Sequence, residues 1–147
     1  MGPAKCRVRV AESTDSQRII QLLSQLGYDS TPAQVEARLR RRQELGGRHE
    51  IWVAELDGTV CGVMAASLET RLGSDEQKVH VTELVVDRAV RGKGIGKNLI
   101  NAAAMWGTKQ NADLLFVLSN QQRTDAHEFY RALNFEETHR TFKLSLV

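Results

Sequence analysis

The stretch that decides the fold is Val86-Asp87-Arg88-Ala89-Val90-Arg91-Gly92-Lys93-Gly94-Ile95-Gly96-Lys97, which joins an apolar run to a segment of helical periodicity. A helix N-terminus exposes unpaired N–H groups and a partial positive charge. Glycines carry no Cβ, so a ligand can approach those N–H groups closely. The arrangement favours a pyrophosphate, and Arg91, Lys93 and Lys97 add positive charge beside it. A plain strand-to-helix turn with solvated lysines is the alternative.

Two other nucleotide-binding motifs fit this stretch poorly. A P-loop needs the pattern GxxxxGK followed by Ser or Thr, which the chain does not contain. A Rossmann fingerprint needs GxGxxG, but its last glycine would fall at Lys97. The ribose-binding acid of that fold should also end the next strand, which ends here at Ser119-Asn120.

On both sides of this stretch, hydrophobic periodicity predicts the element order β α α β β β α β α β. Strands are expected over residues 7–10, 51–56, 60–68, 79–86, 114–118 and 135–147. Helices are expected after caps at Ser13–Ser16 and Thr31, and over 98–106 and 124–133. Asp57-Gly58 indicates a hairpin, and residues 71–77 are expected to form a polar loop. The order predicts a single α/β domain over residues 1–147, with a hairpin-built sheet followed by a βαβ unit.

The composition is that of an ordinary globular chain and disfavours two kinds of partner. The 147 residues are 41% hydrophobic and 26% charged, with a formal net charge of +2. This charge is too small to argue for nucleic acid, and the arginine-rich run 38–42 lacks interleaved aromatic residues. We therefore interpret that run as the solvent-exposed face of a helix. No apolar stretch approaches the ~20 residues that span a bilayer, so we expect no membrane partner.

The two cysteines, Cys6 and Cys61, are not arranged for a disulfide framework or for a metal. Neither belongs to a CxxC pair, and no His/Cys cluster has the spacing of metal ligands, so we expect no metal. Such cysteines are usual in a reducing compartment, and we expect a cytoplasmic location.

Three stretches resemble the signature of the GNAT superfamily of acetyl-CoA-dependent N-acetyltransferases. Arg91-Gly92-Lys93-Gly94-Ile95-Gly96, after an apolar strand, resembles the acetyl-CoA motif. Leu114-Leu115-Phe116-Val117-Leu118-Ser119-Asn120 resembles the family strand that ends in a polar residue. Ala126-His127-Glu128-Phe129-Tyr130-Arg131-Ala132-Leu133-Asn134-Phe135 resembles the family's A-x-x-F-Y-x-x-L-G-F stretch, with Asn134 where glycine is usual. Asn tolerates the left-handed conformation best after glycine, so we expect this turn to form.

The resemblance implies a fold and a co-substrate, which is acetyl-CoA. The fold would be α/β and GNAT-like, with a mixed, mostly antiparallel central sheet, a splayed acetyl-CoA-binding strand pair and about four flanking helices. The residues implied for acetyl-CoA are Leu84, Val85 and Val86 for the pantetheine arm, the backbone of Arg91, Gly92, Lys93, Gly94, Ile95, Gly96 and Lys97 for the pyrophosphate, Asn120 for a pantetheine amide, and Ala126, Phe129 and Tyr130 at its far end.

The reaction implied by the resemblance needs an acid and a base. Acyl transfer releases a thiolate of pKa ~8.5, to which the phenol of Tyr130, of pKa ~10, can return a proton. An acceptor amine of pKa ~10.4 is almost fully protonated at pH 7, so something must take its proton. His80 and Glu83 are the candidate bases, and Thr82 or water stays open. We expect a bulge in this strand, so alternation alone does not decide which side chain faces the cleft.

The expected function is direct transfer of an acetyl group from acetyl-CoA to a primary amine on a small molecule. A protein N-terminus or lysine is an alternative acceptor, and a non-catalytic acyl-CoA-binding sensor is an alternative function. Acceptor choice is expected to lie with the first two helices and the loop 71–77, and His49 and Trp52 are further candidates for the substrate side. We also expect a homodimer that pairs through the final strand, where apolar residues alternate from Phe142 onward.

Overall fold

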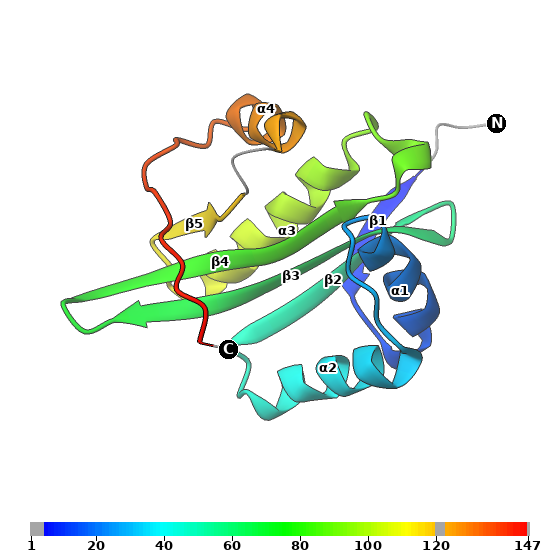
Figure 1. The fold of residues 1–147 in the computed structure, drawn as a ribbon, viewed down its shortest axis with the longest axis horizontal. Helices are drawn as coiled ribbons and strands as arrows, with labels where there is room; N and C mark the ends of the chain where they lie inside the picture. The colour runs from blue at the N-terminus through cyan, green and yellow to red at the C-terminus, as the bar shows by residue number, and fades with distance from the viewer. Residues whose placement is uncertain (1–4, 120–122, 147) are drawn as a thin grey trace. The chain divides into compact units, whose positions relative to one another are not determined.

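The computed structural model describes residues 5–119 and 123–146 in two units, one ending at Phe116 and the other beginning at Val117. The elements are β1 (Cys6–Val10), α1 (Ser16–Ser24), α2 (Pro32–Glu44), β2 (His49–Leu56), β3 (Thr59–Arg71), β4 (Ser74–Val86), α3 (Ile95–Lys109), β5 (Leu114–Val117) and α4 (Thr124–Ala132), with 3-10 turns at Ser13–Asp15 and Arg88–Val90 (Figure 1). None of the helices in the described ranges is both long and apolar enough to cross a membrane.

The strands form one mixed sheet in the order β1-β2-β3-β4-β5. The first four strands pair antiparallel, each with the next. The hairpin between β2 and β3 turns at Asp57-Gly58, as predicted, and both residues have positive φ, 52° and 83°. Two positive φ angles match the right-handed twist of the flanking strands, which explains the Asp-Gly signal. The fold is therefore α/β with a mostly antiparallel sheet, as expected.

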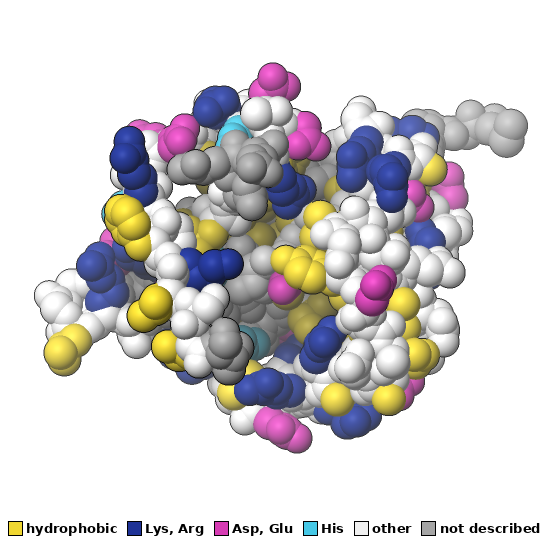
Figure 2. Space-filling view, in the orientation of Figure 1, with side chains coloured by type: hydrophobic (Ala, Val, Ile, Leu, Met, Phe, Trp, Pro, Cys, Tyr) yellow, Lys and Arg dark blue, Asp and Glu magenta, His cyan; other side chains and the backbone are white. Residues whose placement is uncertain are grey.

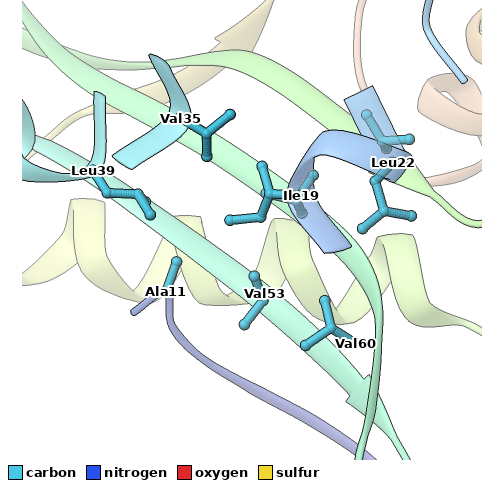
Figure 3. Packing of buried hydrophobic residues seen from close by; sticks show 9 residues of the cluster. Ala11, Ile19, Leu22, Val35, Leu39, Val53 and Val60 are labelled. Carbon is cyan, nitrogen blue, oxygen red and sulfur yellow. The ribbon is translucent and has the colours of Figure 1, made fainter. Parts of the chain in front are cut away.

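Helices α1 and α2 cover one face of this sheet (Figure 3). Ile19 and Leu22 of α1 pack with Val35 and Leu39 of α2, and Val53 of β2 lies beneath them. All five side chains are at most 6% exposed. Burying each one contributes roughly 1.5–3 kcal/mol, so this cluster fixes the two helices on the sheet.

The N-terminal cap of α2 and its solvent-exposed face are both as the sequence predicts. Thr31 Oγ1 accepts a hydrogen bond from the Gln34 N–H, and Gln34 Oε1 accepts one from the Thr31 N–H, at 3.2 and 2.9 Å. Lys and Arg side chains gather over α2 in Figure 2, and the arginines of the run 38–42 are exposed apart from Arg42, which is half-buried and binds Glu50 at 2.9 Å. The interpretation of this run as the solvent-exposed face of a helix is confirmed.

Helix α3 covers the opposite face. Its residues Ile95, Leu99 and Ala103 are at most 1% exposed. A Cβ added to Gly62 of β3 would lie 3.1 Å from Leu99, and the ring of Trp106 meets that of Trp52 edge-on, with centroids 5.5 Å apart. Trp52 is 6% exposed and belongs to this core, so its expected place on the substrate side is wrong.

Residues 71–77 form a hairpin and not the predicted loop. Strand β3 continues to Arg71 and β4 starts at Ser74, so only Leu72 and Gly73 turn. The extended part of the hairpin pairs polar residues across the two strands, for example Glu69 with Lys78. Polar residues on a solvated antiparallel hairpin have the same composition as a loop, which is why composition misled the prediction.

The predicted final strand, 135–147, is absent from the described residues of the second unit. Residues 135–146 have no regular structure, and Phe142, Leu144 and Leu146 are 90%, 84% and 91% exposed. Alternation describes a side-chain pattern, but a strand also needs an edge with which to pair. The described part of this unit offers only the helix α4, apart from the last residue of β5.

Candidate active site

The glycine turn leads from the end of β4 into an open helix N-terminus. Gly92 and Gly94 have φ of 82° and 77°, and Gly94 is the N-cap of α3 without any side-chain cap. A Cβ at either glycine would meet no atom within 4 Å, so the approach to the turn is open. Ile95 is 1% exposed and anchors the first turn in the core, which leaves the N–H groups around it oriented for a ligand.

Positive charge surrounds this turn. Arg91, Lys93 and Lys97 are exposed, and Arg91 Nε donates to the Val86 carbonyl at 3.3 Å. An uncapped helix N-terminus with cations beside it favours a bound phosphate group. A pyrophosphate site at this turn stays a prediction.

A hydrogen-bond network that sequence reasoning missed ties the turn to α1. Asp87 accepts from the Ala89 N–H at 3.1 Å and from Arg18 Nη2 at 2.9 Å. Gln25, the C-cap of α1, also donates to the Asp87 carboxylate, and its Oε1 accepts from the Arg88 N–H at 3.1 Å. The hydrogen bonds from Ala89, Arg18 and Gln25 hold the pKa of the Asp87 carboxyl below its usual range. An Asp two residues before a turn N–H is a recognisable cap, but its partners on α1 follow only from the fold.

The expected bulge is present in β4, at Thr82. Ala65 of β3 pairs with Glu83, whereas the next residue, Ala66, pairs with Val81, so Thr82 is the extra residue. The Thr82 hydroxyl lies 2.6 Å from Glu83 Oε2 and donates to it. The bulge therefore shifts the faces of all β4 residues that precede it relative to those that follow.

This shift brings the two candidate bases to the same face of the sheet. His80 pairs with Ser67 and Glu83 with Ala65, and Ser67 and Ala65 are two residues apart on β3. Residues two apart point to one face, and paired residues share a face, so His80 and Glu83 do too. In a regular strand their spacing of three would separate them. His49 of β2 also pairs with Ser67 and shares this face.

His80 is held by two neighbours within the first unit. Its Nδ1 lies 2.9 Å from Glu69 Oε1 on β3. Its ring stacks on Phe116 of β5, with centroids 4.5 Å apart and planes at 14°. The His80 side chain is 18% exposed, so it is largely covered and still reachable by solvent.

Beyond the bulge, Leu84, Val85 and Val86 pair with β3 on one edge of β4. On the other edge, the contacts of β5 within the first unit fall before the bulge. The Asp113 N–H donates to the Gln77 carbonyl at 2.8 Å, and Phe116 lies beside His80. Val85 is 2% exposed, so its side chain is core and only its backbone could meet a ligand.

The remaining predicted site residues belong to the second unit or lie outside the described residues. Ala126, Phe129 and Tyr130 are on α4, where the Tyr130 ring packs against Phe129 and Phe135 with centroids 5.3 and 5.4 Å away. Burial raises the pKa of the Tyr130 phenol, and Arg123 lowers it by a smaller amount. Asn120 is outside the described residues.

The turn after α4 forms as predicted with Asn in place of Gly. Asn134 has φ of 67°, and the Phe135 N–H donates to the Tyr130 carbonyl at 3.0 Å. A left-handed residue just after the last helical turn is the usual way to close a helix.

Within the described ranges, no group of three or more His, Cys, Asp or Glu side chains is arranged to hold a metal ion. The two cysteines are free; Cys61 is buried, and burial raises the pKa of its thiol.

The sheet, the bulged β4 and the open turn before α3 are those of an acyltransferase of mixed α/β fold. The chain belongs to the acetyltransferase (GNAT) family, whose model matches residues 17–135.

Several relatives and solved structures are similar to this chain. The human N-acetylaspartate synthetase is 32% identical over 84 residues, which are 57% of this chain and 26% of that protein, so the chain spans about a quarter of this relative's length. The aminoalkylphosphonate N-acetyltransferase of Salmonella typhimurium is 25% identical over 96% of this chain and 92% of its own. An aminoglycoside N-acetyltransferase solved in complex with CoA is 22% identical, with a TM-score of 0.86 over 98% of this chain and 96% of that one, and this likeness shows the fold.

Proposed function

We propose that this chain transfers the acetyl group of acetyl-CoA to a primary amine on a small molecule, by direct attack of the amine. The observation that carries the proposal is the construction of β4. Its bulge at Thr82 sets His80 and Glu83 on one face, and the same strand then leads into the open turn before α3. Both units are taken as one acetyltransferase domain, because the family match runs across both.

Acetyl-CoA is the proposed co-substrate because the turn suits its pyrophosphate. The backbone N–H groups from Gly92 to Lys97 would bind the phosphates, and Arg91, Lys93 and Lys97 would balance their charge. The backbone of residues 84–86 would bond the pantetheine arm, with the second-unit residues Ala126, Phe129 and Tyr130 at its far end. A solved relative of the same fold is described as a complex with CoA, which supports this choice.

His80 is the proposed base, with Glu83 as the alternative. An amine of pKa ~10.4 must lose a proton before attack, and an imidazole exchanges protons readily near neutrality. His80 lies on the same face as Glu83, is largely covered, and keeps Nε2 without a hydrogen-bond partner among the described residues. Glu83 instead accepts a hydrogen bond from Thr82, which occupies one of its oxygens.

Tyr130 is the proposed acid that returns a proton to the departing thiolate. Ordinary phenols lie about 1.5 pKa units above thiols, so the transfer is already uphill. Burial raises the pKa of Tyr130 further, which keeps the phenol protonated and makes it a weaker acid. The role therefore requires the donor and the thiolate to be held close together.

The acceptor is proposed to be a small amine, because similar proteins are named N-acetylaspartate synthetase and aminoalkylphosphonate N-acetyltransferase. A solved structure of the same fold is described as an aminoglycoside N-acetyltransferase. A protein acceptor is the second candidate, because a ribosomal-protein-alanine N-acetyltransferase from Brucella melitensis shares the fold with a TM-score of 0.80. The residues that select it would be those of α1, α2 and the exposed hairpin at 71–77. We propose no nucleic-acid or membrane partner.

The experiment is a panel of amines and N-terminal peptides incubated with acetyl-CoA, with release of free thiol as the readout. Turnover with a small amine supports the proposal. Turnover with peptides alone assigns a protein acceptor. CoA binding by calorimetry without turnover on any amine would indicate an acyl-CoA sensor, and absence of CoA binding at millimolar concentration would refute both.

We further propose a cytoplasmic homodimer. The free thiols suit a reducing compartment. The apolar side chains of Phe142, Leu144 and Leu146 are exposed, and a second copy would cover them. Light scattering should then give about twice the 16.4 kDa of one chain, and a mass of one chain at micromolar concentration would contradict the dimer.

A further inference from the structure

We propose that Glu69 is a positioning residue that fixes the tautomer of His80 and makes its Nε2 the proton acceptor, with Phe116 holding the plane of the ring. This inference rests on the proposed function, because it assigns the geometry of the base in that reaction. It starts from the pair formed by Glu69 on β3 and His80 on β4.

The contact between these two side chains determines where the imidazole proton lies. Glu69 Oε1 and His80 Nδ1 are 2.9 Å apart. An ionised carboxylate can only accept hydrogen bonds, so Nδ1 must carry the hydrogen. A neutral imidazole carries one N–H, and its other nitrogen, Nε2, is then the one that can take a proton. A carboxylate thus converts a histidine with two accessible tautomers into a base with a defined accepting atom.

Phe116 restricts the rotation of the His80 ring, whereas Glu69 fixes its tautomer. The His80 and Phe116 rings are nearly parallel, at 14°, with centroids 4.5 Å apart. The hydrogen bond from one side and the stacked ring from the other leave the imidazole one orientation. A base held in this way needs less reorganisation when it takes the proton.

The charged groups around His80 come from three strands. On β3, Glu69 touches it directly. On β4, Lys78 stands opposite Glu69 and lies 3.8 Å from Glu76, while Glu83 shares the face of His80 beyond the bulge. On β2, His49 faces it across Ser67, and β5 contributes the uncharged Phe116. Among these, Glu69 is the only group within hydrogen-bond distance of the imidazole, so it is the one that orients the ring.

The exposure of Glu69 sets how much activity its removal should cost. Glu69 is 47% exposed, so water screens its charge and can replace part of its hydrogen bond. We therefore expect a loss of about 10-fold on its removal, which is the low end for outer residues that orient a functional histidine.

The direct test is the tautomer of His80, read by nitrogen-15 NMR of the labelled protein. The chain has four histidines, and the signal of His80 is assigned from its loss in His80→Gln. In the native protein the hydrogen should be on Nδ1, and in Glu69→Gln, which can donate as well as accept, the tautomers should mix. A native His80 with its hydrogen on Nε2, or an unchanged tautomer in Glu69→Gln, would overturn the proposal.

The second test uses the kinetic constants of the reaction. Glu69→Gln should lower kcat about 10-fold and leave KM for acetyl-CoA unchanged. In a His80→Ala background the same substitution should have no further effect, since Glu69 acts through His80.

Glu76→Gln is the matched control. Glu76 is a carboxylate on the same hairpin, and it contacts Lys78 and Arg71 at 3.8 and 3.9 Å and not His80. Glu76→Gln should leave both kcat and the tautomer of His80 unchanged. A rate loss in His80→Ala without any loss in Glu69→Gln would refute the positioning role alone. If no amine is acetylated at all, the proposed function fails, and the tautomer measurement still decides whether Glu69 fixes His80.

Discussion

Replacing Gly94 with Asp isolates the role of the glycine turn as a pyrophosphate site. Gly94 has φ of 77°, is exposed, and would receive a Cβ without any atom within 4 Å. The substitution therefore creates no clash in the folded chain. The strain of a left-handed residue costs roughly 1 kcal/mol, and Asp at a helix N-cap offsets part of it. The free energy of unfolding should change by less than about 1 kcal/mol.

The effect on CoA affinity should be much larger. Two like charges 4 Å apart repel by about 4 kcal/mol at an effective dielectric constant of 20. Solvent at an exposed turn reduces this to roughly 2–3 kcal/mol, which weakens binding about 30- to 150-fold. Gly94→Ala adds the same backbone strain without the charge, so it should lose less than Gly94→Asp.

Gly47 provides a matched control elsewhere in the chain. It lies between α2 and β2 with φ of 78°, and a Cβ there would also meet no atom within 4 Å. Gly47→Asp therefore imposes the same strain and the same added charge, far in sequence from the turn. It should leave CoA affinity unchanged.

Calorimetry gives the dissociation constant, and thermal unfolding gives an independent measure. CoA at 100 times its dissociation constant stabilises the native chain by about 2.7 kcal/mol, but a variant that binds 100-fold more weakly by only about 0.4 kcal/mol. At roughly 2–4 °C per kcal/mol, the melting temperature should rise about 5–11 °C in the first case and about 1–2 °C in the second. Equal CoA affinities for Gly94→Asp and Gly47→Asp would show that the phosphates bind elsewhere.

Three further outcomes are expected. Tyr130→Phe should lower the rate of thiol release about 10²-fold with little change in CoA affinity, and full turnover would mean that the ring only packs. Gly107→Ala should lower the melting temperature by about 3–6 °C, because its Cβ would lie 2.5 Å from Val79 Cγ2, and an unchanged value would contradict the packing. Asp15 and Asp87 have pKa values lowered in the fold, by the hydrogen bonds of Arg9 and of Ala89 respectively. Their stabilisation is complete above the ordinary Asp pKa of about 3.9 and is lost as pH falls below it, so urea unfolding from pH 6 to pH 2 should show declining stability, less steeply in Asp15→Asn.

The parts of the fold that the sequence predicted depend on local chemistry. The cap of α2 uses two side chains three residues apart, and the Asp57-Gly58 hairpin uses two adjacent positive φ angles. Asn134 takes the left-handed conformation expected of the glycine that it replaces. In each case the residues that make the structure are neighbours in the chain, so their pattern is visible in one window.

The errors arose where a segment needs a distant partner. Residues 71–77 belong to a hairpin and not to a loop because Thr70 pairs with Gln77, and no single residue type signals that pairing. The segment 135–146 has strand-like alternation, but no strand forms there. The same limit applies to the site, because the contacts of His80 with Glu69 and Phe116 join residues of three strands.

The bulge at Thr82 is required by the packing of hydrophobic residues of β4 on both faces of the sheet. Val79 packs against Gly107 on the α3 face, and Val81, two residues on, shares that face. Val85 belongs to the cluster beneath α1 and α2 on the opposite face. Regular alternation would put all three valines on one face, so one extra residue must be inserted between Val81 and Val85. That residue also turns Glu83 to the face of His80, and the packing of two hydrophobic cores thereby sets the geometry of the proposed base.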